Sequence, residues 1–198
     1  MPKKNKEKEL LKTAITQGGY FTAKQALKIG FSYRAQKYYI ETNNWIKEGR
    51  ALYRFDFIPF SKYDEYIKVS FWSRDKDDNS QAVISHQSAL EVHGIGDIIP
   101  GKIYFTVPKS FRKKVAKGCI CHKEDFVKKD TEIREGFKVT TPVKTIIDIA
   151  EKVDTEQLEK VLYDAHQKGL ISQSYIEKAR TNNHIKRKLL NILARFRK

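Results

Sequence analysis

The sequence has little cysteine, a single methionine and no long apolar run. Its two cysteines, Cys119 and Cys121, are too close for an ordinary loop-closing disulfide and too few to staple a fold, as expected in a reducing compartment. No segment approaches the roughly 20 apolar residues that cross a bilayer, and the N-terminus leads into no apolar signal region. These absences exclude a disulfide-stapled secreted domain and predict a cytoplasmic protein with no membrane partner.

Motifs of the common catalytic classes are missing as well. No aspartate or glutamate stands two residues before a lysine, as in the widespread nuclease pattern, and there is no Gly-x-Ser-x-Gly elbow. The segment from Gly96 to Ile103 has the spacing of a phosphate-binding loop, but Ile103 replaces the required Ser or Thr and continues into a strand. We therefore expect no enzymatic activity and no cofactor, and keep an enzyme acting on nucleic acid or on a toxin as a remote alternative.

A metal site is the remaining chemical possibility. Cys119, Cys121 and His122 offer thiolate and imidazole ligands that suit zinc, but a second ligand pair at zinc spacing is missing. Free cysteine is common as a small buried residue. Structural burial is the favoured interpretation, and we expect no metal.

Positive charge is what the sequence has in excess. The 198 residues include 39 Lys plus Arg against 24 Asp plus Glu, a net charge of +15, with a pI near 9.7. Residues 1–60 contribute +7 of this charge and residues 61–198 contribute +8. A surplus of this size predicts a polyanionic partner, most simply nucleic acid, although an anionic membrane or ribosomal RNA satisfies the same arithmetic.

Helix-ending signals organise the N-terminal part. Thr22 and Ser32 are good N-caps, and Gly30 separates the two helices that they begin. The predicted elements are helices at residues 6–17, 23–29 and 33–48, and a strand or hairpin at 50–58. Two short helices joined by a tight glycine turn and followed by a hairpin predict a winged helix-turn-helix domain over residues 1–60.

The remaining residues, 61–198, have a different pattern. Residues 61–73 fit either a helix or a strand, and Ser85 to Gly94 reads as a capped helix that ends at glycine. Short strands are expected at 102–107, 119–122, 132–134 and 137–139, and helices at 143–152, 155–168, from 172 and at 183–197. The overall prediction is an α+β fold with a mixed strand and helix C-terminal domain.

The helix after Ser32 carries the most specific functional prediction. The residues expected to turn outward in its first two turns, where a recognition helix reads bases, are Tyr33, Arg34, Gln36 and Lys37. Arg34 is suited to guanine and Gln36 to adenine, each contact contributing about 1–3 kcal/mol of discrimination. The alternative is an ordinary solvated helix face, and winged helices also serve as protein-binding modules.

Other basic residues are candidates for phosphate contacts. Two of the segments that carry them are a basic loop around residues 109–117 and the stretch 178–198, which has eight basic residues and no acidic one. Such runs are usually solvated, but neutralised phosphates release counterions and add salt-dependent affinity. The predicted phosphate-contacting residues are Thr22, Lys24, Arg50, Arg54, Lys109, Arg112, Lys113, Lys114, Lys186, Arg187 and Lys188.

Two segments give the chain a family resemblance. Ile84-Ser-His86-Gln-Ser-Ala-Leu-Glu-Val-His93-Gly94 and Val139-Thr-Thr-Pro142-Val-Lys-Thr-Ile-Ile-Asp148, placed after a winged helix, resemble the AbiEi antitoxins of type IV toxin-antitoxin (abortive-infection) systems. The resemblance implies phage defence and an N-terminal domain that binds inverted repeats in its own operator and represses the operon. It also implies a C-terminal domain that opposes a nucleotidyltransferase-like toxin without a stable complex.

The resemblance leaves several points open. Family wings often carry an Arg-Gly-x-Tyr-like turn, whereas Arg54-Phe-Asp-Phe57 has no glycine. We expect a monomer in solution and two copies on double-stranded operator DNA. One alternative is a winged-helix repressor whose C-terminal domain senses a small molecule, and another is an antitoxin that neutralises its toxin by direct contact. Ser85, His86, His93 and Asp148 are assigned to helix capping and packing.

Overall fold

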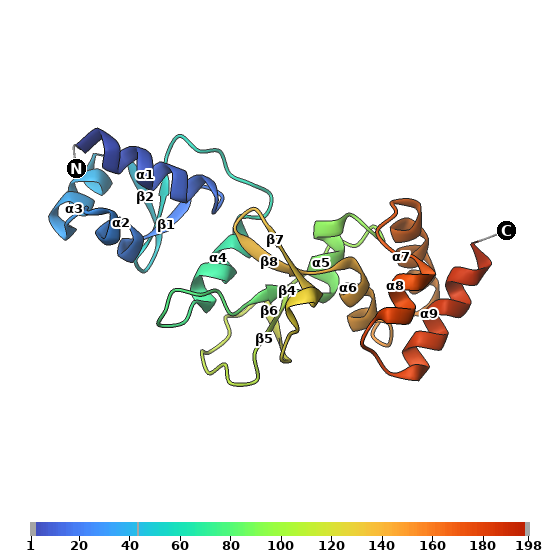
Figure 1. Ribbon diagram of the computed structural model, residues 1–198. Helices are drawn as coiled ribbons and strands as arrows, with labels where there is room; N and C mark the ends of the chain where they lie inside the picture. The colour runs from blue at the N-terminus through green and yellow to red at the C-terminus, as the bar shows by residue number, and fades with distance from the viewer. Residues whose placement is uncertain (1–2, 43, 197–198) are drawn as a thin grey trace. The chain divides into compact units, whose positions relative to one another are not determined.

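A helix followed by a short strand opens the chain in the computed structural model, which describes residues 3–42 and 44–196. The first compact unit comprises the chain up to Trp72 together with Glu135–Phe137. Its elements are α1 (Lys3–Ile15), β1 (Tyr20–Thr22), α2 (Ala23–Ile29), α3 (Tyr33–Glu41), β2 (Trp45–Gly49), β3 (Leu52–Phe55) and α4 (Asp64–Ser73) (Figure 1). The three strands form an antiparallel sheet in the order β1-β3-β2.

Aromatic side chains fill the core of the first unit. Phe21, Phe31 and Trp45 are 0%, 4% and 2% exposed. The Trp45 ring lies 4.8 Å from the Phe21 ring and 5.3 Å from the Phe31 ring, both edge-on. Such pairs add about 0.5–1.5 kcal/mol each beyond the burial of their area. Leu10 and Ala14 of α1 are fully buried in the same cluster, so helix and sheet share one core.

The two N-caps predicted in this unit are confirmed, whereas the first helix, predicted at residues 6–17, spans Lys3–Ile15. The Thr22 hydroxyl accepts from the Gln25 amide at 3.1 Å, and the Ser32 hydroxyl accepts from the Ala35 amide at 3.2 Å. Between the two helices Gly30 has φ +100°, a left-handed conformation that glycine adopts without steric cost. The connection between α2 and α3 is therefore fixed by local chemistry that the sequence displays.

The prediction for the end of the third helix is wrong. The helix was expected to run to about Glu48, but α3 ends at Glu41 and the chain continues as strand β2. Trp45 pairs with Phe55 in the antiparallel ladder between β2 and β3. Helical spacing of apolar residues does not reveal this ladder, because the pairing partner lies ten residues further along the chain.

The tip of the β2–β3 hairpin is the turn at Arg50 and Ala51. Ala51 has φ +57°, a left-handed conformation that favours glycine. The residues Arg50-Ala-Leu-Tyr53 therefore match the Arg-Gly-x-Tyr-like turn of family wings, with Ala51 in place of the glycine. The segment Arg54-Phe-Asp-Phe57, at which this turn was expected, begins inside β3.

The segment that fitted either a helix or a strand is the helix α4, and it belongs to the first unit. Tyr63 and Tyr66 pack edge-on against Phe137, with ring centroids 5.6 and 5.7 Å apart. The Ser70 hydroxyl donates to the carbonyl of Gly136 at 3.3 Å. The compact units thus divide after Trp72, whereas the sequence placed a domain boundary at residue 60.

The second compact unit comprises Ser73–Arg134 and Lys138–Lys198. Its strands are β4 (Val83–Ile84), β5 (Ile103–Val107), β6 (Cys119–Lys123), β7 (Thr131–Arg134) and β8 (Phe137–Thr140), in the order β6-β5-β4-β8-β7. Strand β4 is antiparallel to β5 and parallel to β8, and β5 is parallel to β6. Two sheets with packed helices confirm the α+β fold class.

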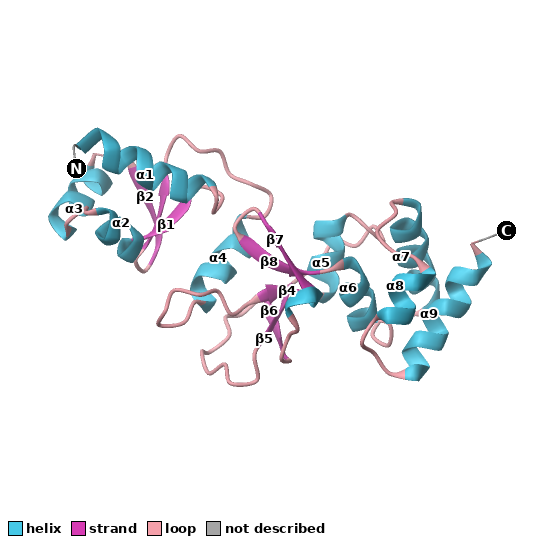
Figure 2. Ribbon diagram, viewed as in Figure 1, coloured by secondary structure: helices cyan, strands magenta, loops and turns pink. Residues whose placement is uncertain are grey.

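The second unit also contains helices, drawn in cyan in Figure 2 and joined by loops. They are α5 (His86–His93), the short 3-10 helix η1 (Lys128–Asp130), α6 (Pro142–Ile149), α7 (Thr155–Gln167), α8 (Gln173–Lys178) and α9 (Asn183–Arg195). Ile146, Leu158 and Leu189 from α6, α7 and α9 are fully buried in one core cluster. No helix within residues 3–42 and 44–196 is long and apolar enough to cross a membrane.

Candidate functional site

An exposed basic and aromatic face lies on α3. Its side chains are Tyr33, which is 71% exposed, and the exposed Arg34 and Lys37. Lys37 forms an exposed ion pair with Glu41, one turn on, at 3.5 Å. These residues lie in the first two turns of the helix, as their spacing in the sequence predicts.

Gln36 does not belong to this face. Its side chain is 3% exposed, and its amide nitrogen donates to the carbonyls of Phe31 at 3.0 Å and Ala23 at 3.3 Å. The prediction that Gln36 contacts adenine is therefore wrong, because a Gln36 side chain that reached a base would leave these two buried carbonyls without their donor. Gln36 instead ties the start of α3 to the start of α2.

The start of α2 offers one accessible cation. Thr22 and Gln25 form a capping box, in which the Gln25 side chain also accepts from the Thr22 amide at 2.9 Å. The half-buried Thr22 hydroxyl is thereby engaged within the helix cap. Lys24, the second residue of α2, is exposed, so the predicted pair is reduced to Lys24 as the surface group.

The two hairpin arginines have opposite environments. Arg50 is exposed at the tip of the β2–β3 turn. Arg54 is 2% exposed, donates to the carbonyl of Ile58, and lies 3.6 Å from a Glu48 carboxylate oxygen. Its guanidinium also covers the ring of Phe60 at 3.8 Å. The prediction that Arg54 reaches DNA is therefore wrong, because the side chain is held inside the unit.

The basic loop between β5 and β6 is on the surface. Lys109, Arg112, Lys113 and Lys114 are all exposed. Arg112 donates to the carbonyl of Lys109 at 3.1 Å, and Lys113 donates to the carbonyl of Arg74 at 2.7 Å. The Lys109 ammonium also lies 3.9 Å from a carboxylate oxygen of Asp125, in an exposed ion pair.

The three predicted DNA-contacting residues of α9 also differ in exposure. Lys186 donates to the carbonyl of Glu177 at 2.9 Å, and Lys188 donates to the carbonyl of Ala150 at 2.7 Å. Both are half-buried and hold the C-terminal ends of neighbouring helices, where a cation is favourable. Arg187 alone of the three is exposed.

A buried polar chain lies where α5 begins. The Ser85 hydroxyl is 2.8 Å from the Thr106 hydroxyl and 2.9 Å from Nδ1 of His86, and Nε2 of His86 is 2.6 Å from the Lys152 ammonium. An ammonium only donates, so Nε2 of His86 accepts and Nδ1 donates to Ser85. The Ser85 and Thr106 hydroxyls share the next hydrogen bond of the series. Ser85 therefore does not cap α5 as predicted, because its hydroxyl is used in this chain.

The environment of His86 keeps it neutral. Its ring stacks on His122 at 3.8 Å, and its backbone has φ +53°. Burial, with the nearby His122 and Lys152, lowers the pKa of His86 to about 3. Ser85 is fully buried, so its hydroxyl is not accessible as a nucleophile to a substrate. Sequence reasoning missed the link to Lys152, which lies 66 residues away and carries no motif.

A second charged group lies on α6. Lys144 is 2.5 Å from Asp148 and 2.8 Å from Glu124. Burial raises the pKa of Asp148 to about 6, against the opposing effect of the Lys144 ammonium.

His93, also predicted as a packing residue, donates from Nε2 to the carbonyl of Thr140 at 2.8 Å. In the described part of the chain no group of three or more His, Cys, Asp or Glu is arranged to hold a metal ion.

Comparison with known proteins concerns the second unit. A family model for the AbiEi antitoxin C-terminal domain matches residues 81–182, just over half of the chain. The match begins two residues before β4 and ends just before α9, so it includes the sheet and the His86 chain. A search of curated proteins finds no match.

Proposed function

The chain belongs to the AbiEi antitoxin family, and from this premise we propose that it is a type IV antitoxin that also binds its operator DNA and represses its own operon. The toxin that this protein counteracts is nucleotidyltransferase-like, and the two proteins form no stable complex. The protein is a non-enzymatic regulator that acts in the cytoplasm in phage defence. It is a monomer in solution, and two copies bind the inverted repeats.

The observation that carries the DNA-binding part is the exposed α3 face. It consists of Tyr33, Arg34 and Lys37, in a unit whose element order and β1-β3-β2 sheet fit a winged helix-turn-helix. In such domains the second helix of the motif enters the major groove with its N-terminal side chains. Arg34 would bond guanine, contributing about 1–3 kcal/mol of discrimination.

Backbone contacts surround this face in our proposal. Lys24 at the start of α2 and Arg50 at the hairpin tip hold phosphates beside α3. The exposed cations of the second unit add contacts that do not depend on sequence, and they are Lys109, Arg112, Lys113, Lys114 and Arg187. Gln36 and Arg54 are left out of the DNA-facing set because they are buried. Lys186 and Lys188 are left out because they are half-buried and hold backbone carbonyls of neighbouring helices.

Operator binding tests the first part of the proposal. Retention of a DNA fragment from upstream of the gene is measured for the full chain and for Arg34→Ala, with a scrambled fragment for comparison. Lys12→Ala, which removes an exposed cation from α1, is the matched control. We expect Arg34→Ala to lose about ten-fold or more in operator affinity and little on scrambled DNA. Unchanged retention of Arg34→Ala on the operator refutes the recognition-helix assignment.

Co-expression with the toxin tests the second part. We expect the chain to restore growth of cells that produce the toxin, while a tagged chain purified from them carries no toxin. Recovery of the toxin with the tagged chain contradicts the type IV assignment and identifies a protein-binding antitoxin. Failure to restore growth contradicts the antitoxin assignment itself.

A further inference from the structure

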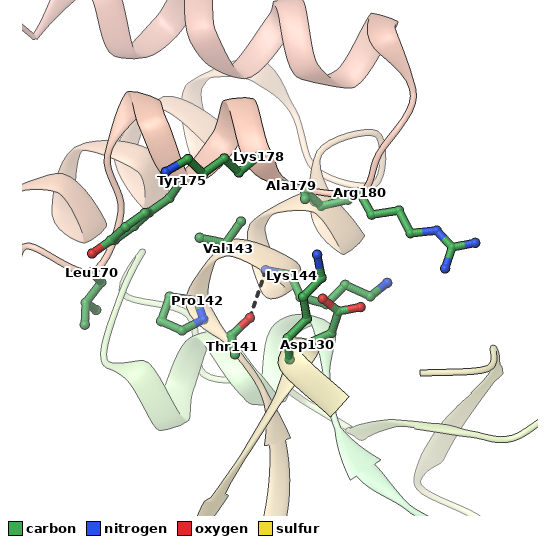
Figure 3. A pocket seen from close by; sticks show the side chains of 12 residues that line it. Asp130, Thr141, Pro142, Val143, Lys144, Leu170, Tyr175, Lys178, Ala179 and Arg180 are labelled. Atoms are coloured by element: carbon green, nitrogen blue, oxygen red, sulfur yellow. Dashed lines mark hydrogen bonds between the residues drawn. The ribbon is translucent and has the colours of Figure 1, made fainter. Parts of the chain in front are cut away.

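A pocket of about 350 Å³ lies in the second unit, and none of the residues proposed to contact DNA lines it. It is formed by η1, the first turns of α6, and α8 with the residues that follow it (Figure 3). Its volume lies within the range of roughly 300–1,000 Å³ that is typical of small-molecule sites. The buried His86 chain does not contribute to its lining.

One side of the pocket is apolar and includes an aromatic ring. Pro142 and Val143 of α6, with Leu170, form this side, and Tyr175 of α8 lies across from α6 (Figure 3). Tyr175 is 54% exposed, so part of its ring is available to a ligand. A flat apolar group that enters here gains stacking on the tyrosine ring.

The rim of the pocket is cationic. Lys129, Lys178 and Arg180 line it and are exposed. Within the described residues none of the three is ion-paired to a carboxylate, and Asp130 is the one acidic side chain of the lining. The fourth cation, Lys144, is neutralised from behind by Glu124 and Asp148. The rim therefore has three uncompensated positive charges beside a single carboxylate.

A flat apolar wall next to uncompensated cations is complementary to a base joined to phosphates. We propose that this pocket binds a nucleotide, with the base against Tyr175 and Pro142 and the phosphates beside Lys178, Arg180 and Lys129. Duplex DNA does not fit this description, because its base faces are covered by their stacked neighbours. The nucleotide is either a free nucleoside triphosphate or an unpaired terminal nucleotide of an RNA strand.

Binding to the full chain, measured by calorimetry, tests the proposal. The probes are ATP and CTP, inorganic triphosphate without a base, and a short single-stranded oligoribonucleotide with a free 3′ end. The same oligoribonucleotide with its 3′ end closed in a hairpin is the comparison for RNA. We expect either a nucleoside triphosphate or the free RNA end to bind at least ten-fold more tightly than its comparison probe. The probe that binds identifies the source of the nucleotide.

Surface variants tie the binding to this pocket. Tyr175→Ala should weaken binding of the nucleotide about ten-fold without changing binding of inorganic triphosphate, and Arg180→Ala should weaken both. The matched controls are Tyr163→Ala, a 49% exposed tyrosine on α7, and Lys117→Ala, an exposed cation of the same unit. Absence of base-dependent binding, or binding that Tyr175→Ala changes no more than Tyr163→Ala, overturns the proposal. Arg34→Ala leaves nucleotide binding unchanged, so this outcome is independent of operator binding.

Discussion

Replacing Gln36 by leucine distinguishes a base-reading side chain from one that holds the first unit together. Two hydrogen bonds, to the carbonyls of Phe31 and Ala23, are lost in Gln36→Leu, and leucine fills most of the volume. Each bond contributes about 1 kcal/mol net, and each carbonyl remains buried without this donor. We expect the free energy of unfolding of the first unit to fall by about 2 kcal/mol.

The assay uses tryptophan fluorescence during urea unfolding. Both tryptophans, Trp45 and Trp72, belong to the first unit, so their emission reports its unfolding without interference from the second. Lys37→Leu is the matched control on the same helix, since its exposed ion pair with Glu41 contributes only about 0.3–0.5 kcal/mol.

Operator retention of Gln36→Leu is then measured at low temperature without urea, where the unit is folded. We expect selectivity for the operator to persist, because Arg34 and Lys37 still face outward. An unchanged unfolding midpoint together with lost operator selectivity would refute the reasoning, because it would mean that Gln36 contacts a base and that its buried bonds are dispensable.

Three further predictions follow from the structure. Ala51→Gly should stabilise the first unit by about 0.5 kcal/mol in the same urea assay, because φ +57° disfavours a side chain; a loss of stability would contradict the assigned turn. Burial keeps the folded-state pKa of His86 near 3, below its ordinary 6.5, so the stability that depends on neutral His86 is complete above pH 6.5 and is lost as the pH falls toward 3. Folding raises the pKa of Asp148 from 3.8 to about 6, so this carboxyl adds stability as the pH falls between those values and offsets part of the loss caused by His86. Asp148→Asn should therefore lose stability more steeply than the native chain between pH 6 and pH 4, as measured by far-ultraviolet circular dichroism; an equal or shallower loss would count against this assignment. Lys113→Ala and Arg187→Ala should each weaken binding to operator and scrambled DNA alike and reduce the salt slope by about one, whereas Lys186→Ala should leave the slope unchanged and lower stability; equal slopes for all three would contradict the assigned surfaces.

Local signals made much of the fold predictable. Thr22, Ser32 and Asp154 each accept a hydrogen bond from an amide three residues later, so these helix starts are encoded within one turn of the chain. The helix that ends at Gly94 was predicted for the same reason, since glycine at a left-handed C-cap is a local signal.

Distant partners explain what was not predictable. The early end of α3 depends on the β2–β3 ladder, and the burial of Gln36 depends on a carbonyl 13 residues away in α2. Lys188 resembles any exposed cation of a basic helix until the carbonyl of Ala150, 38 residues earlier, is brought to it. Composition identifies a basic protein, but the tertiary fold determines which cations remain available to a polyanion.

The turn at Glu135–Phe137 has a consequence for exchanging parts between relatives. This tripeptide lies far along the chain, yet Phe137 covers Tyr63 and Tyr66 of the first unit and Gly136 accepts from Ser70. A chimaera that grafts only the first 72 residues onto another antitoxin would carry two uncovered tyrosines and aggregate more readily. Recombination that changes the proposed operator specificity must therefore transfer two separate gene segments, or confine itself to the outward side chains of α3.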